Sequence, residues 1–64
     1  MFGVIVNPVS GGREVAGLAV QITERIAALG EESRIFETGG DGDAAAQTRA
    51  ALAAGCQSIV CIGG

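Results

Sequence analysis

The sequence predicts an α/β fold, namely a three-layer βαβαβ piece of a parallel sheet. Three short runs of apolar and β-branched residues, at 2–6, 33–38 and 58–62, alternate with two helical patterns, at 13–29 and 43–54. Strands and helices of these lengths in strict alternation are typical of a parallel sheet with right-handed crossovers. A chain of 64 residues has room for one domain at most.

The first strand and the helix that follows it have the clearest patterns. Residues 2–6 form an uninterrupted apolar run, which predicts a strand covered on both faces, and Asn7-Pro8 ends it. Apolar residues then recur at steps of three and four, which predicts one buried stripe along a helix. Gly30 can take the left-handed conformation that ends a helix. The stripe consists of Val15, Leu18, Ala19, Ile22, Ile26 and Leu29.

The remaining three elements are shorter. Polar residues flank Ile35 in the second run, so we expect a strand nearer an edge of the sheet. Asp43 is a suitable N-cap for the alanine-rich helix, which can lie close to the sheet and is closed by Gly55. The third run predicts another buried strand, which leads into Gly63-Gly64.

Composition and charge exclude several classes of protein. The net charge is -3 and Phe2 and Phe36 are the only aromatic residues, so we expect no nucleic-acid partner. Cys56 and Cys61 lie five positions apart in a chain without histidine, which suits neither a disulfide nor a zinc site. We expect both to be reduced, small apolar residues of the interior. No basic leader or membrane span is evident at the start, so we expect a soluble cytoplasmic protein.

The segment 7–13, Asn-Pro-Val-Ser-Gly-Gly-Arg, is the strongest candidate for a binding site. Gly11 and Gly12 let the backbone approach a ligand, and a helix start offers unpaired N–H groups with a partial positive charge. Ser10 either caps the helix or donates to a phosphate oxygen, and Arg13 is placed to pair with phosphate from the first turn. A plain strand-to-helix turn with a serine cap is an equal alternative. The spacing fits neither a Walker A loop nor a G-x-G-x-x-G fingerprint.

A second glycine cluster, at 39–42, precedes Asp43. We interpret it as a turn, because a helix rather than a strand follows and Asp43 serves as the cap of that helix. In the alternative interpretation Asp41 and Asp43 form an acid–base or magnesium pair, since carboxylates hold the ion that bridges nucleotide phosphates. Solvated turn acids are the simpler interpretation.

Taken in order over the whole chain, these motifs resemble the diacylglycerol kinase catalytic-domain family, whose fold is that of the NAD kinase/diacylglycerol kinase-like group. In that family the third strand leads into Gly-Gly-Asp-Gly-Thr, of which Gly63 and Gly64 match the first two glycines. The cluster at 39–42 looks similar, but it follows the second strand and is not followed by threonine. The resemblance rests on the strand before Asn-Pro-x-Ser-Gly-Gly, the amphipathic helix, Thr38 at a strand end, Gly42-Asp43-Ala44 opening a helix, and Gly63-Gly64.

The resemblance implies an ATP-dependent lipid kinase that uses Mg²⁺ and phosphorylates a hydroxyl of a diacylglycerol-like lipid. Residues 1–64 then correspond to the N-terminal part of the nucleotide-binding kinase domain. The general base, most of the metal contacts and a β-rich acceptor domain that touches the membrane surface transiently are expected beyond Gly64, so this piece alone is expected to be inactive. The nucleotide-binding residues so implied are Asn7, Ser10, Gly11, Gly12, Thr38, Gly63 and Gly64, to which the helix-start argument adds Arg13.

Two other interpretations stay open from the sequence. A relative of NAD kinase has the same fold and a similar glycine-rich motif, although Asn-Pro-Val-Ser-Gly-Gly favours the lipid branch. A non-catalytic α/β binding module of flavodoxin-like type would use residues 10–13 as its only anion site. In either case the free edges of a three-stranded sheet predict self-association into a homo-oligomer.

Overall fold

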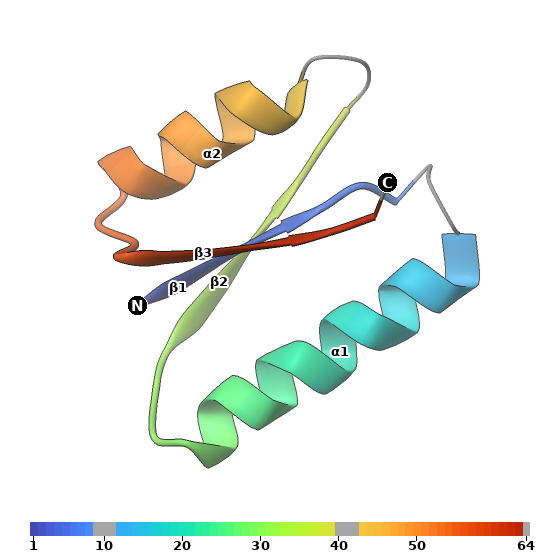
Figure 1. The fold of residues 1–64 in the computed structure, drawn as a ribbon, viewed down its shortest axis with the longest axis vertical. Helices are drawn as coiled ribbons and strands as arrows, with labels where there is room; N and C mark the ends of the chain where they lie inside the picture. The colour runs from blue at the N-terminus through green and yellow to red at the C-terminus, as the bar shows by residue number, and fades with distance from the viewer. Residues whose placement is uncertain (9–11, 40–42, 64) are drawn as a thin grey trace.

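The structure is a computed structural model that describes residues 1–8, 12–39 and 43–63. Three strands and two helices alternate along the chain and form a sheet between two helical layers (Figure 1). This confirms the predicted α/β class and the βαβαβ order. The elements are β1 (Phe2–Val6), α1 (Gly12–Ala28), β2 (Ser33–Glu37), α2 (Asp43–Ala53) and β3 (Ser58–Ile62).

The three strands are parallel and lie in the order β2-β1-β3, with β1 at the centre. The chain therefore moves from β1 to one neighbour, and then crosses back over β1 to reach the other side. Helix α1 connects β1 to β2 in one direction across the sheet, and α2 connects β2 to β3 in the opposite direction. Because both connections have the same hand, the two helices lie on opposite faces of the sheet. Figure 1 shows α1 and α2 on the two sides of the sheet.

Two small cores, one on each face, hold the layers together. The side chains of a strand alternate between its faces, so β1 contributes to both cores. This central strand is buried from Gly3 to Val6, as its uninterrupted apolar run predicts. The core under α1 contains Val4, Val6, Val15, Ala19, Ile26 and Ile62, and the core under α2 contains Ile5, Ala51 and Cys56.

Both helices end in the same hydrogen-bonded motif around a glycine with positive φ. After α1, Gly30 has φ of 81°, its N–H donates to Ala27 O, and the Glu31 N–H donates to Ile26 O. After α2, Gly55 has φ of 96° and the N–H groups of Gly55 and Cys56 bind the two equivalent carbonyls, those of Leu52 and Ala51. This is the Schellman arrangement, and it confirms both predicted glycine stops.

The buried stripe of α1 is narrower than the sequence predicts. Val15, Ala19 and Ile26 are buried and Ile22 is partly buried, but Leu18 is exposed and Leu29 has 71% of its surface exposed. Leu29 lies beyond the last helical residue, Ala28, so the helical periodicity no longer determines the direction of its side chain. A three-stranded sheet is also too small a platform to cover every apolar position of a helix of 17 residues.

The outer strand β3 is less buried than its sequence suggests. The edge position predicted for β2 is confirmed, but β3 lies at an edge of the described sheet too, and the prediction of a buried strand there was wrong. Cys61 is consequently exposed, whereas Cys56 is buried under α2 as expected. Both cysteines are free thiols. None of the helices in the described part of the chain has the length and apolar character to span a membrane.

The alanine-rich helix α2 lies very close to the sheet above Gly3. A Cβ atom at Gly3 would be 2.9 Å from Ala51 Cβ, 3.1 Å from Ile59 Cδ1 and 3.2 Å from Cys56 Sγ. Ala51 has no exposed surface. The small side chains on both sides therefore set the distance between this helix and the sheet.

Candidate functional site

Three of the predicted site residues meet at the carboxyl edge of the sheet. Asn7, Thr38 and Gly63 each directly follow a strand, and Val6 pairs with both Glu37 and Ile62 in the ladders. The N–H of Asn7 donates to Ile62 O at 3.0 Å, and the N–H of Thr38 donates to Val6 O at 2.8 Å. The three positions are therefore side by side across the sheet although they are far apart in the sequence.

The strand order makes the gap between β1 and β3 a topological switch point. From β1 the chain turns to β2 on one side, while β3 lies on the other side and is reached over the opposite face. In open α/β sheets, ligands bind in the crevice outside the carboxyl ends of the strands at such a point. Asn7 and Gly63 flank this crevice.

Gly63 is required by two independent features of its position. Its φ of 104° is in the left-handed region, and a Cβ atom would lie 3.1 Å from Asn7 Cβ and 3.2 Å from Asn7 O. The glycine thus lets the end of β3 pass close to the end of β1. The same absence of a side chain leaves the backbone approachable at the crevice.

Replacing Gly63 with alanine is expected to lower the free energy of unfolding by about 2 kcal/mol, because left-handed strain and crowding of Asn7 add together. Gly12 is the matched control: its φ is 52°, but nothing lies within 4 Å of a Cβ atom there. Gly12→Ala should lower the free energy of unfolding by only about 1 kcal/mol, because it introduces the left-handed backbone strain without the crowding. Urea unfolding followed by far-ultraviolet circular dichroism measures both variants. If the two variants lose the same free energy of unfolding, the crowding of Asn7 by a side chain at position 63 does not contribute to the loss.

Helix α1 begins beside this crevice, at Gly12. Its first N–H groups have no partner within the helix and carry the positive end of the helix dipole. Arg13 lies in the first turn and is exposed, so its guanidinium can reach an anion. The predicted residues Ser10 and Gly11 lie outside the described residues, as does Gly64.

Thr38 is the one buried polar residue of the described chain, with 6% of its surface exposed. Its Oγ1 atom is inaccessible and has no hydrogen-bond partner among the residues described. A hydroxyl left in this state costs roughly 1–3 kcal/mol. An unsatisfied donor at the carboxyl edge of a parallel sheet is therefore a group that a ligand could satisfy.

Asp43, at the start of α2, has a structural task in the connection from β2. Its Oδ2 atom accepts hydrogen bonds from the Gly39 N–H at 2.6 Å and from Gln47 Nε2 at 3.4 Å. Asp43 was predicted to be the N-cap ahead of this helix, but it is the first residue of α2, and its carboxylate binds back to Gly39 rather than standing free in solvent. This favours the turn interpretation for Asp43, while Asp41, the other member of the suggested acidic pair, lies outside the described residues.

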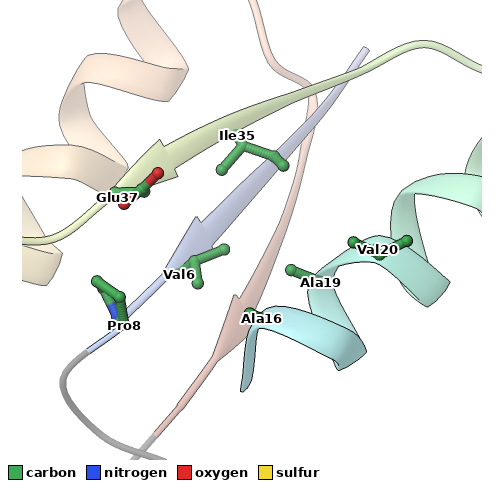
Figure 2. A pocket seen from close by; sticks show the side chains of 7 residues that line it. All are labelled: Val6, Pro8, Ala16, Ala19, Val20, Ile35 and Glu37. Carbon is green, nitrogen blue, oxygen red and sulfur yellow. The ribbon is translucent and has the colours of Figure 1, made fainter. Parts of the chain in front are cut away.

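An apolar groove of about 200 Å³ lies between α1 and β2, beside Pro8. Figure 2 shows Ala16, Ala19 and Val20 on the helix side, facing strand residues across the gap. Glu37, the last residue of β2, places its carboxylate at the groove. Pro8 belongs to the predicted segment 7–13, but Glu37 was not predicted from the sequence. Glu37 could have been found as the charged residue closing a strand at the carboxyl edge, but the groove depends on how α1 lies over the sheet.

Among the residues that the structure describes, no three histidine, cysteine, aspartate or glutamate side chains are grouped so that they could hold a metal ion. The site consists instead of strand ends, a helix start and one unsatisfied hydroxyl. Such an arrangement suits an anionic ligand held by N–H and O–H donors.

Comparison with known proteins agrees with this geometry. The family model described as diacylglycerol kinase catalytic domain matches residues 1–64. No curated protein and no solved structure matches the chain. Because the family model covers every residue of the sequence, the chain belongs to the diacylglycerol kinase catalytic-domain family.

Proposed function

We propose that this chain holds the phosphates of ATP for transfer of the γ-phosphoryl group to the hydroxyl of a diacylglycerol-like lipid. The observation that carries the ATP part is the meeting of Asn7, Thr38 and Gly63 at the carboxyl edge of the sheet, beside the start of α1. The lipid part rests on family membership, since the family implies kinase activity in general. In a cytoplasmic location the lipid would be met at a membrane surface.

Each group at the edge has a distinct task in this proposal. The start of α1 supplies N–H donors and a positive dipole end for phosphate oxygens. Arg13 supplies one positive charge near the phosphates, in a chain whose net charge is -3. Thr38 donates its hydroxyl to a ligand oxygen, and Gly63 keeps the crevice open between β1 and β3. All of these contacts position the phosphates, which is the main contribution of protein groups to phosphoryl transfer.

Mg²⁺, which accompanies ATP in phosphoryl transfer, does not fit the described residues as a bound ion. Asp43 Oδ2 is already engaged by Gly39 and Gln47, and the described residues contain no group of three or more potential metal ligands. The proposal therefore assigns no metal ligand and no general base to them. Their part is to bind and orient the nucleotide.

Titration with ATP, ADP and AMP, followed by the backbone amide signals of a ¹⁵N-labelled sample, tests this proposal. We expect the affinity to fall in the order ATP, ADP, AMP, because phosphate oxygens make the contacts. The largest shifts should occur at Asn7, Thr38 and Gly63. Equal affinity for the three nucleotides, or shifts scattered away from the carboxyl edge, would contradict the proposal.

The variant Arg13→Gln should weaken ATP binding about three- to fivefold, as expected for one exposed charged contact. The effect should shrink as salt is raised, since exposed charges are screened. Arg25→Gln is the matched control, because Arg25 is also exposed but lies in the last turn of the same helix. If both variants lose the same affinity, the loss reflects overall charge, and Arg13 has no place in the site.

A further inference from the structure

Thr38 is held by a hydrogen bond on each side of its Cα atom. The Thr38 N–H donates to Val6 O at 2.8 Å, and the next N–H along the chain, that of Gly39, donates to Asp43 Oδ2 at 2.6 Å. These two N–H groups belong to the two planar peptide units that flank the Cα atom of Thr38. Because only φ and ψ rotate between such planes, fixing both planes fixes the direction of the Thr38 side chain.

The two hydrogen bonds have different kinds of acceptor. The first continues the pairing of β1 with β2, whose last paired residues are Val6 and Glu37. The second lies beyond that pairing, at a glycine, which has wide backbone freedom unless it is held. The side chain of Asp43 therefore holds the peptide plane that follows Thr38, past the last residue pair of the two strands.

Asp43 is itself firmly placed. It is the first residue of α2, where a carboxylate is stabilised by the positive end of the helix dipole. Gln47, one turn further along, donates its Nε2 to the same Oδ2 atom at 3.4 Å. Ala51 of this helix is fully buried in the core under α2, which anchors the helix to the sheet. The carboxylate is therefore a fixed, charged acceptor for the Gly39 N–H.

The direction of the Thr38 hydroxyl depends on this backbone geometry. Its Oγ1 atom is buried and has no hydrogen-bond partner among the described residues, so no hydrogen bond to them orients it. Threonine is branched at Cβ, and its χ1 rotamer depends on the φ and ψ of the residue. The groups that fix the two peptide planes therefore also fix where the hydroxyl points.

We propose that Asp43 is a positioning residue of the nucleotide site, whose carboxylate directs the Thr38 hydroxyl toward the ligand by holding the Gly39 N–H. This inference rests on the proposed binding of ATP, and Asp43 itself acts without touching the nucleotide. An unsatisfied buried hydroxyl that is free to turn would bind a nearby carbonyl group or water, because it then recovers a hydrogen bond. Holding it in place avoids that reorganisation when the nucleotide binds.

The sign of the effect separates this role from simple electrostatics. A carboxylate near a phosphate site repels the ligand, so by charge alone its removal would strengthen ATP binding. Removal of a residue that positions a hydrogen-bond donor weakens binding instead. The loss cannot exceed that caused by removing the Thr38 hydroxyl itself, so Thr38→Val sets its upper limit.

ATP titration of the full-length protein and its variants tests the proposal, with circular dichroism as the check of folding. Asp43→Ala should weaken ATP binding about five- to tenfold, and Asp43→Asn, which keeps an oxygen acceptor for the Gly39 N–H, only about two- to threefold. Gln47→Ala is the matched control, because it removes the other hydrogen bond to Oδ2 but leaves Gly39 held. Its ATP affinity should stay within about twofold of the wild type, since the lost hydrogen bond is long.

Combination with Thr38→Val shows whether Asp43 acts through Thr38. In a protein that already lacks the hydroxyl, Asp43→Ala should cause no further loss of ATP affinity, because the group that it disturbs is absent. Losses that multiply in the double variant would overturn the proposal. A folded Asp43→Ala variant that binds ATP at least as tightly as the wild type would overturn it too. If Asp43→Ala does not fold, the same comparisons with Asp43→Asn decide.

A measurement without ATP separates this proposal from the function on which it rests. The three-bond couplings of Thr38 Cγ2 to the backbone nitrogen and carbonyl carbon report χ1 in the free protein. We expect one rotamer in the wild type and in Gln47→Ala, and averaging over rotamers in Asp43→Ala. If the wild type does not bind ATP, the proposed function fails, while the couplings still decide whether Asp43 positions Thr38. Averaging in the wild type, or one unchanged rotamer in Asp43→Ala, would contradict the positioning role.

Discussion

Replacing Gly3 with alanine is expected to lower the free energy of unfolding by about 2–3 kcal/mol, the usual cost of overpacking a well-filled core. The added Cβ atom would be 2.9 Å from Ala51 Cβ, which belongs to a fully buried residue on helix α2. It would also crowd Ile59 and Cys56, so no direction of relief is open. For a domain of this size, with a total stability of roughly 3–10 kcal/mol, the loss is a large fraction.

Two matched variants make this prediction specific. Gly17→Ala introduces the same methyl group on α1, where nothing lies within 4 Å, and should stabilise the helix by about 1 kcal/mol. Ala51→Gly removes the nearest neighbour, so a double-mutant cycle of Gly3→Ala with Ala51→Gly should show a favourable coupling above about 1 kcal/mol. Urea unfolding is followed by far-ultraviolet circular dichroism, since the chain has no tryptophan. A neutral Gly3→Ala variant would show that α2 can move away from the sheet at little cost.

Replacing Thr38 with valine is expected to change stability and ATP binding in opposite directions. The Oγ1 atom of Thr38 is buried without a hydrogen-bond partner among the described residues, so an isosteric methyl group removes a desolvation cost. We expect the free energy of unfolding to rise by about 1 kcal/mol. If the hydroxyl donates to the nucleotide, as proposed, ATP affinity should fall about tenfold, the effect of one hydrogen bond to a charged group. Thermal unfolding with and without ATP measures both effects.

Thr48→Val is the control for this prediction. Thr48 Oγ1 already donates to Ala44 O at 2.8 Å within α2, so its removal should leave ATP binding unchanged. Two results would count against the role of Thr38. A loss of stability in Thr38→Val would mean that the hydroxyl is satisfied in the free protein, and unchanged ATP affinity would mean that it does not touch the ligand.

Local sequence patterns were sufficient to predict the helices and strands and, to within one residue, most of their ends. The β-branched runs gave β1 and β3 with the observed bounds, and Gly30 and Gly55 marked the helix stops because only glycine adopts the required φ at low cost. The predicted first helix began one residue late and ended one residue late, and the second strand was one residue too long, at Thr38. Errors of this size are expected where a chain leaves a ladder or a helix gradually.

Strand order and depth of burial were not predictable in the same way. A continuous apolar run indicates that a strand can be covered on both faces, but it does not say which strand lies in the centre. The runs of β1 and β3 are similarly apolar, yet β1 is buried and β3 lies at an edge. The exposure of Cys61 follows from this order, which depends on contacts between distant parts of the chain.

The candidate site was predictable as a list of residues but not as an arrangement. Asn7, Thr38 and Gly63 each follow a strand, and the parallel order brings them to one edge. The sequence does not indicate that the Thr38 hydroxyl is buried without a hydrogen-bond partner among the described residues, or that Gly63 lies against Asn7, because both depend on the three-dimensional arrangement. The roles of Ser10, Gly11 and Gly64 stay predictions, since these residues lie outside the described part of the chain.

The central position of β1 has a consequence for the kinetics of folding. Phe2 pairs with Ser33 and with Ser58, so its partners lie 31 and 56 positions along the chain (33 − 2 and 58 − 2). Pairing at such separations raises the contact order, and closing these loops costs entropy before the contacts form, which slows folding. As the chain leaves the ribosome, β1 emerges first and remains without its second neighbour until β3 is made. Over that interval a nascent chain would carry its most apolar strand with one edge open, and would be a natural substrate for chaperones.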